Sequence, residues 1–334
     1  MRTKGCCIIL AAVMLLAGCK SISMDEYVDT RTLTLVMQST MSEYAKESAT
    51  VFINKVSEIS NGALKVQLIE TDRALEVFDE GHDLFFASNE VMAEADGSFL
   101  SYTSPFYFSN YRHMTLTLNS EQFFSLTRET ALNLLGAEAL AAFYDGSQLF
   151  LTIRDETMNN PAELESLKIY IPDDPLLEYT LNRMGMETTV KTLEDRVDGF
   201  NTGYYLTIVC DSLFLENIVL PQRRERINVS QSFATAKINW MMLSAGTKAD
   251  LSSYEKAVID EALAYAIALG DRQLETKEEN GIEHLKSIGA VITQPNYYEF
   301  FEKTDEILEE SARYYNLWDW NQHRSIREIA PNYI

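Results

Sequence analysis

Three observations predict an α/β protein with mostly parallel strands and two packed domains. Segments with strand periodicity alternate with segments of helical periodicity, which is the pattern of sheets covered by helices. The chain has 334 residues, of which 46% are hydrophobic, so it is long enough to bury two cores. Its 14 glycines and 7 prolines are scattered, and no internal repeat is visible, which argues against a disordered or repeat protein.

The first 19 residues have the composition of a bacterial lipoprotein signal. Arg2 and Lys4 precede a short apolar run, and small residues stand directly before Cys19. The run is shorter than the ~20 apolar residues that a membrane span needs. We therefore expect a signal peptide over residues 1–18, a lipid on Cys19 and a tether over residues 19–30. The protein would lie on the periplasmic or extracytoplasmic face of a membrane; an ordinary secretory signal and a single span are the alternatives.

Cysteine usage and charge exclude several classes of protein. After cleavage, Cys210 would be the one cysteine left besides the acylated Cys19, so no disulfide framework is expected. The formal charge of −22 argues against nucleic acid, which requires a basic surface. It also argues against adhesion to anionic lipid, so the lipid anchor would hold the protein at the membrane.

The first elements are a strand, a helix and a strand. Residues 32–38 alternate as a strand does, residues 44–60 place apolar side chains on one helical face, and residues 63–70 alternate again. Asn61-Gly62 stands between the helix and the second strand. A left-handed residue at the C-terminus of a helix favours glycine, so this pair should end the helix.

The remaining elements continue the alternation of short strands with helices. The expected strands are residues 83–87, 111–118, 149–153, 167–171 and 205–209. The expected helices are residues 120–140, 176–184 and 252–286, the last rich in Ala, Glu, Leu and Lys.

Four short motifs follow one another along the chain. They are Asn61-Gly62 after a helix, Ser104-Pro105-Phe106-Tyr107-Phe108, the stretch AELESLKIY at residues 162–170, and Val197-Asp198-Gly199-Phe200-Asn201. In order and spacing they resemble motifs of the substrate-binding proteins of TRAP (tripartite ATP-independent periplasmic) transporters. The resemblance covers nearly the whole chain after the tether, from about residue 33 to residue 315.

The resemblance implies a two-lobed periplasmic-binding-protein-like fold with a ligand cleft between the lobes and a long helix that braces both. Residues 252–286 match the bracing helix in position and length. It also implies an integral membrane permease as partner. The expected division of the chain is 31–148 plus 228–265 for lobe I, 149–227 plus 266–315 for lobe II, and 316–334 for a C-terminal tail.

Departures from the family pattern concern the ligand. The family has an arginine, which binds a carboxylate, at the position of Tyr170, and a phenol supplies neither the charge nor the two parallel donors. A second basic position of the family corresponds to Gln148. Arg154 is a substitute if the strand register shifts; otherwise it is a surface residue. The segment between Gly185 and Asp198 is shorter than in the family, so we expect a wider or differently lined cleft.

These departures predict an apolar or amphipathic small-molecule ligand. An organic acid bound by another cation such as Arg154 is the alternative, and core packing is the alternative for each aromatic residue. Some TRAP systems that lack the arginine resemble this chain and include a tetratricopeptide-repeat protein, which would be a further partner. The candidate ligand-binding residues are Gln38, Phe106, Tyr107, Gln148, Arg154, Tyr170, Phe200, Asn201, Tyr204 and Trp240.

Catalysis is not expected. The four histidines are scattered without metal-ligand spacing, and no nucleophile elbow, phosphate-binding loop or dinucleotide fingerprint is present. His82 is the best single candidate for a general base, but a turn position explains it equally. The sequence thus predicts no enzyme, no cofactor and no metal. A structural lipoprotein that associates through its aromatic tail is the third alternative.

Overall fold

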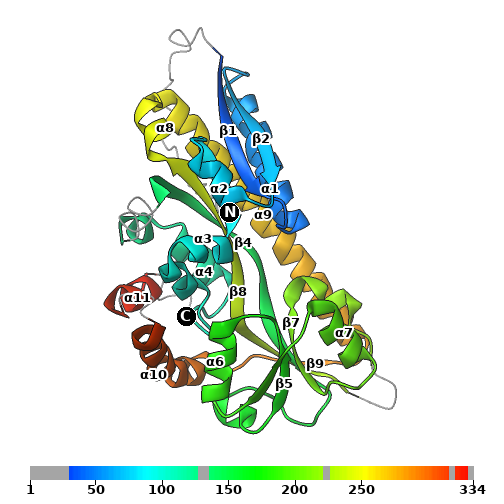
Figure 1. Ribbon diagram of the computed structural model, residues 1–334. Helices are drawn as coiled ribbons and strands as arrows, with labels where there is room; N and C mark the ends of the chain where they lie inside the picture. The colour runs from blue at the N-terminus through cyan, green and yellow to red at the C-terminus, as the bar shows by residue number, and fades with distance from the viewer. Residues whose placement is uncertain (1–29, 127–134, 221–225, 316–319, 330–334) are drawn as a thin grey trace, which may run out of the picture.

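The computed structural model describes residues 30–126, 135–220, 226–315 and 320–329. The expected signal peptide and Cys19 lie outside these residues, as does most of the expected tether. Figure 1 shows two groups of elements, one above the other, joined by two long strands. We call the upper group lobe I and the lower group lobe II.

Lobe I contains the first elements of the chain. They are β1 (Arg31–Gln38), α1 (Glu43–Ile59), β2 (Leu64–Thr71), α2 (Ala74–Asp79), β3 (Leu84–Ser88), α3 (Asn89–Ala95), the 3-10 helix η2 (Gly97–Thr103) and α4 (Tyr111–Leu118). The strand β4 (Ala137–Thr152) then leads into lobe II. The next elements of the chain, in lobe II, are η3 (Pro161–Leu164), β5 (Lys168–Ile171), α6 (Pro175–Arg183), β6 (Glu187–Val190), α7 (Leu193–Asn201), β7 (Thr207–Asp211) and η4 (Ser212–Asn217).

The strand β8 (Asn228–Ser244) returns to lobe I. It is followed by α8 (Ala245–Asp250), α9 (Ser253–Ser287), β9 (Val291–Thr293), α10 (Tyr297–Tyr315) and α11 (Trp320–Arg327). None of the helices among the described residues is both long enough and apolar enough to cross a membrane.

One sheet of nine strands runs through both lobes, in the order β2-β1-β3-β8-β4-β7-β5-β6, with β9 beside β8. The pairs at its two ends are parallel, whereas β3, β8, β4 and β7 pair antiparallel. Along β4 and β8, Ala142 is opposite Trp240 in lobe I, and Leu151 is opposite Val229 in lobe II. Register shifts interrupt this pairing between Tyr144 and Ser147, where the strands pass from one lobe to the other.

The first predicted elements are confirmed, and the local contacts explain them. Ser42 Oγ accepts a hydrogen bond from Ala45 N at 3.0 Å and begins α1. The helix ends at Ile59, and Asn61 and Gly62 follow with φ values of 50° and 78°. This is the left-handed ending that the Asn-Gly pair predicted.

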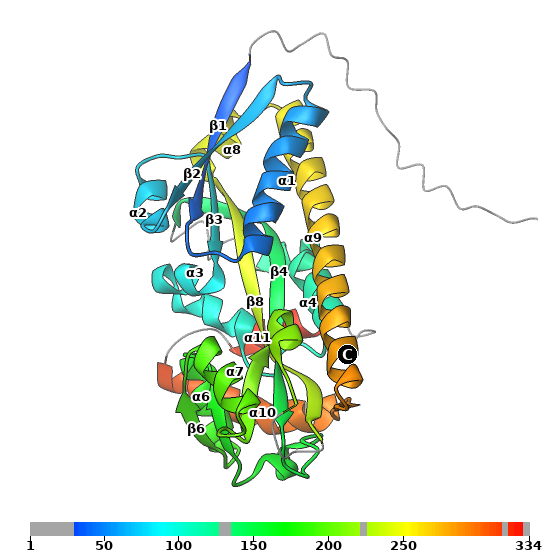
Figure 2. The same cartoon turned by 90° about the vertical axis from the view of Figure 1, so that its right-hand side faces the viewer.

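The long helix α9 runs beside both lobes, as Figure 2 shows. It packs against α1 in lobe I and against η4 and β9 in lobe II. A complete capping box starts it, in which the side chains of Ser252 and Glu255 each accept a hydrogen bond from the other's backbone N–H. The expected bracing helix at 252–286 is therefore present within one residue of its expected bounds.

Two of the expected elements were wrong. Residues 111–118 form α4 and not a strand, because Asn110 caps it and the buried residues His113, Met114, Thr117 and Leu118 recur at helical spacing. The helix expected over 120–140 does not extend to residue 140, since β4 begins at Ala137. The strand expected at 149–153 is the end of this long strand, and β8 was not expected at all.

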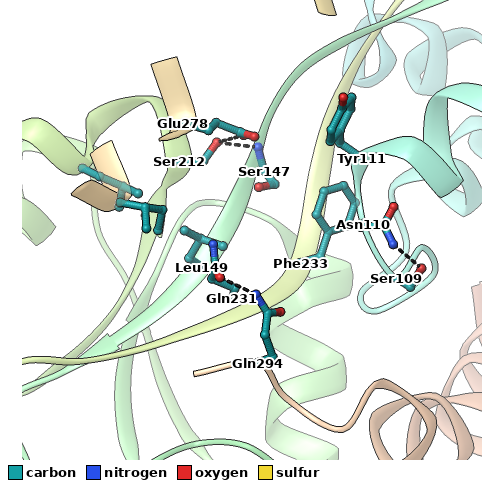
Figure 3. Close-up of a pocket in the computed structure, with 12 residues that line it drawn as sticks. Ser109, Asn110, Tyr111, Ser147, Leu149, Ser212, Gln231, Phe233, Glu278 and Gln294 are labelled. Atoms are coloured by element: carbon teal, nitrogen blue, oxygen red, sulfur yellow. Dashed lines mark hydrogen bonds between the residues drawn. The ribbon is translucent and has the colours of Figure 1, made fainter. Parts of the chain in front are cut away.

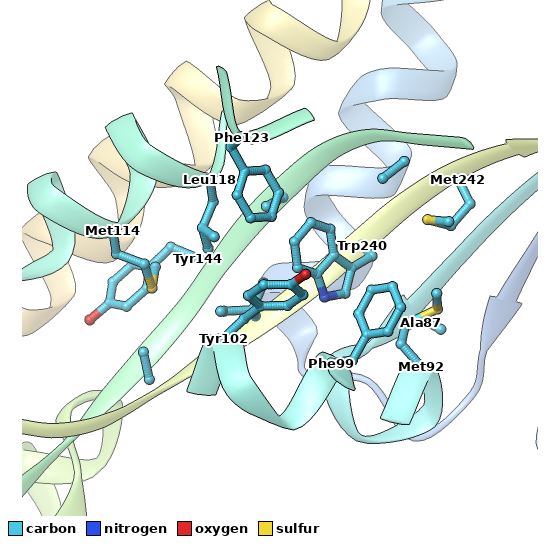
Figure 4. Close-up of a cluster of buried hydrophobic side chains, with 14 of the residues drawn as sticks. Ala87, Met92, Phe99, Tyr102, Met114, Leu118, Phe123, Tyr144, Trp240 and Met242 are labelled. Carbon is cyan, nitrogen blue, oxygen red and sulfur yellow. The ribbon is translucent and has the colours of Figure 1, made fainter. Parts of the chain in front are cut away.

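Lobe I has hydrophobic cores on both faces of the sheet. Figure 4 shows the core under α3, η2 and α4, where Trp240 packs against Phe99, Tyr102 and Phe123 with ring centroids 5.6 to 5.7 Å apart. Figure 2 shows α1 and α9 on the other face, and their apolar side chains form the second core. Lobe II repeats this arrangement, with α6 and α10 on one face and α7 on the other.

Candidate functional site

Two cavities lie between the lobes and share Lys237. The cavity on the lobe I side has a volume of about 330 Å³, and that on the lobe II side about 490 Å³. The first is lined by Gln38, Thr40, Met41, Ser42, Ser88, Glu90, Asp145, Lys237, Ile238 and Asn239. The second is lined by Gln148, Pro172, Asp173, Val190, Lys191, Thr192, Leu193, Asp195, Arg196, Asp211 and Lys237. We call the two together the interlobe cleft.

The topology of the sheet explains why these residues meet. Gln38 and Ser88 end the parallel strands β1 and β3 of lobe I. Pro172, Lys191 and Asp211 stand at or directly after the ends of β5, β6 and β7 in lobe II. Ligands of open α/β sheets bind beyond the carboxyl ends of the strands, and here those ends from both lobes line one cleft.

Lys237 is the charged residue at the centre of the cleft. It lies on β8, and its ammonium group pairs with the carboxylate of Asp211. Burial acts to lower the pKa of Lys237, but the charge of Asp211 and the hydrogen bond to it outweigh this effect and raise the pKa. Because the Asp211 side chain is 2% exposed, the lysine keeps a buried carboxylate paired.

Asp145 supplies a second buried carboxylate, on the lobe I side. It lies within the register shift of β4, and its Oδ1 accepts a hydrogen bond from Ser42 Oγ at 2.5 Å. Burial raises the pKa of Asp145, and the hydrogen bond from Ser42 opposes the rise. Ser42 thus links the start of α1 to a crossing strand at the cleft.

Arg196 is the second cation held in place, on the lobe II side. The helix α7 presents it to the ends of two strands, where Nε donates to Val209 O at 2.8 Å and Nη1 donates to Lys191 O at 2.6 Å. The residue is 2% exposed, and burial lowers its pKa. A guanidinium is therefore fixed at the wall of the cleft by backbone carbonyls and not by a carboxylate.

Gln148 brings an amide into the cleft without a partner. The residue is 4% exposed, and its Oε1 has no hydrogen bond within the described chain. An acceptor buried in this way costs free energy unless a ligand or water donates to it. The site therefore contains a polar atom that a bound solute could satisfy.

A third cavity, of about 170 Å³, lies on the other face of the crossing strands (Figure 3). Ser147 and Leu149 line it, whereas Gln148 between them lines the interlobe cleft, since successive side chains of a strand point to opposite faces. Glu278 of α9 accepts hydrogen bonds there from Tyr144 Oη at 2.5 Å and from Ser212 Oγ. Burial raises the pKa of Glu278. These contacts tie the long helix to the strands.

Of the candidate residues from the sequence, Gln38 and Gln148 line the interlobe cleft. Phe106, Tyr107 and Trp240 do not line it and are at most 1% exposed. Phe106 stacks on Phe300 with centroids 4.6 Å apart, Tyr107 lies in the core of lobe I, and Trp240 Nε1 donates to Asn89 Oδ1 at 2.8 Å.

The candidates from the second half of the chain also lie away from the cleft lining. Tyr170 stacks on Tyr205 with centroids 3.7 Å apart, and Phe200 is fully buried in the same core. Asn201 bonds the backbone of Asn217 and Val219, Tyr204 is 79% exposed, and Arg154 pairs with Glu156. The segment between Gly185 and Asp198, expected to be shorter than in the family, contains the start of α7, which brings Arg196 to the cleft.

The charged residues of the cleft were not among the candidates predicted from the sequence. Lys237 offered a usable signal, because it is a lone charge in an otherwise uncharged strand and is the exposed residue of β8. Asp145 and Arg196 gave none, since a register shift orients Asp145 and the packing of α7 against the strand ends orients Arg196. His82, the candidate base, has its Nδ1 3.1 Å from Thr34 Oγ1 and does not line the cleft. Among the described residues, no group of three His, Cys, Asp or Glu side chains could hold a metal ion.

Comparison with known proteins supports the architecture. Residues 36–194 match the family model of bacterial extracellular solute-binding proteins, family 7. No curated protein sequence matches the chain. A TRAP periplasmic solute-binding protein from Rhodobacter sphaeroides, in an apo open structure, has a TM-score of 0.75 at 13% identity, covering 91% of this chain and 97% of that one.

Two further structures are similar over most of their length. The ectoine-binding protein TeaA of the TeaABC TRAP transporter, in its apo state, has a TM-score of 0.72 at 16% identity, covering 89% of this chain and 100% of its own. A TRAP periplasmic solute-binding protein from Sulfitobacter, with bound β-D-galacturonate, has a TM-score of 0.63 at 15% identity, covering 90% of this chain and 100% of its own. The two-lobed α/β fold expected from the sequence is thereby confirmed.

Proposed function

We propose that the chain, whose residues 36–194 match the family model of bacterial extracellular solute-binding proteins, family 7, is a TRAP-type solute-binding protein that binds a polar small solute in the interlobe cleft and delivers it to a TRAP-type permease. One observation carries this proposal. The carboxyl ends of strands from both lobes line two cavities that share Lys237, so one solute can contact both lobes at once.

The lining supports a polar ligand more than the apolar or amphipathic one expected from the sequence. Most of the residues at the cleft are charged or carry hydroxyl or amide groups. The aromatic residues that suggested an apolar ligand lie in the cores or at the surface. Among the similar structures, one has bound galacturonate and another has bound sn-glycerol-3-phosphate, both of which are polar.

The organic-acid alternative needs a cation in the cleft. Arg154, the candidate from the sequence, pairs with Glu156 and is not among the residues that line the two cavities, which favours other cations for this role. Lys237 and Arg196 are better placed to contact a solute's anionic group. The remaining expectations stay proposals. They are the lipid on Cys19, a tetratricopeptide-repeat partner, and the lobe bounds 31–148 plus 228–265 and 149–227 plus 266–315.

A blocking substitution tests the cleft without knowledge of the ligand. Thr40 lines the lobe I cavity and is exposed, so Thr40→Trp should fill it. Thr50→Trp places the same side chain on the exposed face of α1 and serves as the control. Galacturonate, ectoine, glycerol 3-phosphate and palmitate would be titrated separately by calorimetry.

The expected result is saturable binding of at least one polar solute, one per chain and without turnover. Thr40→Trp should abolish this binding, and Thr50→Trp should retain it. Binding that survives Thr40→Trp would place the ligand elsewhere, and binding of palmitate alone would overturn the polar assignment.

A further inference from the structure

Carboxylates outnumber cationic side chains in the interlobe cleft. Five carboxylates line it, from Glu90, Asp145, Asp173, Asp195 and Asp211, against three cations, Lys191, Arg196 and Lys237. Lys237 is already paired with Asp211, and two guanidinium nitrogens of Arg196 already donate to backbone carbonyls. Among the described residues, Lys237 is thus the one cleft cation that a carboxylate neutralises directly, and the lining keeps a net negative charge.

Three of the carboxylates have no direct side-chain partner among the described residues, although the charge of Glu90 acts on Lys237 and helps to raise its pKa. Glu90, Asp173 and Asp195 are exposed, and within the described parts of the chain their side chains have no ion pair or hydrogen bond. Gln148 Oε1 adds a buried acceptor without a donor on the lobe II side. Gln148 Oε1 is buried and needs a donor, whereas the three exposed carboxylates are solvated acceptors to which a cation can bind.

The free carboxylates come from both lobes. Glu90 lies in the first turn of α3 in lobe I, and Asp173 directly precedes Asp174, the cap of α6 in lobe II. Burial raises the pKa of Asp174 to about 6, and the charge of Glu90 adds to the rise. Acidic groups of the two lobes therefore lie within electrostatic range of each other across the cleft.

We propose that the solute carries an ammonium or guanidinium group, which Glu90 and Asp173 bind from opposite lobes while Gln148 Oε1 accepts one of its hydrogen bonds. This proposal rests on the function proposed above and specifies that the bound solute carries a positive charge. The cation removes the repulsion between the lobes, and it donates to acceptors that are otherwise unpaired. A carboxylate on the same molecule can reach Arg196, so zwitterions belong to the class as well as simple amines.

The test compares probes of defined charge on the purified protein. Putrescine and L-arginine carry ammonium or guanidinium groups, and ectoine carries a related amidinium. Galacturonate and glycerol 3-phosphate are anions, and palmitate is the apolar probe. A small-molecule extract of bacterial culture, separated on cation and anion exchangers, extends the panel. Binding is measured as a shift in melting temperature and then by calorimetry.

The variants are Glu90→Gln and Asp173→Asn, which remove charge and keep shape. Glu187→Gln is the matched control, because Glu187 is a surface carboxylate that pairs with Lys168 away from the cleft. We expect a positively charged probe, or a fraction retained by the cation exchanger, to raise the melting temperature. Each cleft variant should weaken its binding at least tenfold, and the control should leave it unchanged.

Other outcomes overturn the proposal in distinguishable ways. A shift caused by the anions, by palmitate or by the anion-exchanger fraction alone would overturn the charge assignment and leave the binding function standing. An amine that binds equally well to Glu90→Gln and Asp173→Asn would overturn the assigned residues. No shift from any probe or fraction would overturn this proposal together with the proposed function.

Discussion

The ammonium group of Lys237, on a strand that crosses between the lobes, pairs with the buried carboxylate of Asp211 at the end of β7. Asp211 Oδ1 also accepts a hydrogen bond from Leu213 N at 2.9 Å. The ion pair therefore fixes the start of η4 and the floor of the cleft at the same time.

Lys237→Met should lower the free energy of unfolding by about 1 kcal/mol, because the lysine side chain is nearly half exposed and solvent screens the pair. Asp211→Asn removes the charge that Lys237 neutralises. Urea denaturation of both single variants and the double variant should give a double variant less destabilised than the sum of the two. Additive losses would contradict a direct interaction.

Trp240→Phe and Gln148→Leu should have opposite effects on stability and binding. Trp240→Phe leaves the buried Asn89 Oδ1 without its donor and should cost about 1–3 kcal/mol, with no change in solute affinity. Gln148→Leu removes a buried acceptor that has no partner, so stability should hold while affinity falls. Thermal unfolding and calorimetry on each variant measure both quantities. If Trp240→Phe lost affinity and Gln148→Leu did not, Trp240 would have to be assigned to the ligand-binding site.

Asp174→Asn should change the pH dependence of stability. The pKa of Asp174, about 6 in the folded protein, exceeds the unfolded value of about 3.9, so folding binds a proton between these values and stability rises as pH falls through this window. Asparagine is as good a cap and does not titrate. At pH 7.5 the variant should be more stable by about 1–3 kcal/mol, and its advantage should disappear near pH 4.

Asp271, whose burial also raises its pKa to about 6, is unchanged in that variant. The difference between wild type and Asp174→Asn, followed by urea denaturation from pH 4 to 7.5, therefore isolates the cap of α6. A difference that stays constant with pH would show that Asp174 titrates normally in the folded protein.

Gly281→Ala should weaken the contact between α9 and lobe II. A Cβ at this position would lie 2.8 Å from Leu215 Cβ, closer than packed side chains tolerate, so we expect a loss of about 1–3 kcal/mol. Gly246→Ala is the control, because it lies in α8 and its Cβ would meet nothing within 4 Å. The control should be neutral or more stable by about 1 kcal/mol. Equal behaviour of the two variants would contradict a close approach at Gly281.

The sequence was most informative where local signals and burial agree. The helical face that ends at Asn61-Gly62 and the long helix expected over 252–286 were predicted because periodicity and caps operate over a few residues. The strand predicted at residues 111–118 was wrong because alternating Thr and Leu have the periodicity of a strand. The capping side chain of Asn110 and packing against the neighbouring core stabilise a helix there instead.

The site was less predictable because distant segments build it. Gln38 and Gln148 were expected and line the cleft. Asp145 acquires its position from a register shift, and Arg196 acquires its position from the packing of α7 against the strand ends. Aromatic content pointed to a ligand, although a buried ring such as Phe106 fills a core equally well. Only the tertiary arrangement separates these two roles.

The single sheet has a consequence for how the chain folds during synthesis. The strand β3 ends at Ser88, yet its neighbour in the sheet, β8, ends at Ser244, and the same β8 pairs with β4 and β9 in lobe II. A nascent chain shorter than about 244 residues thus lacks part of β8, the central strand of lobe I. Until β8 is complete, the edge of β3 that pairs with it remains unpaired. Both lobes should therefore become protease-resistant together, late in translation, rather than one after the other.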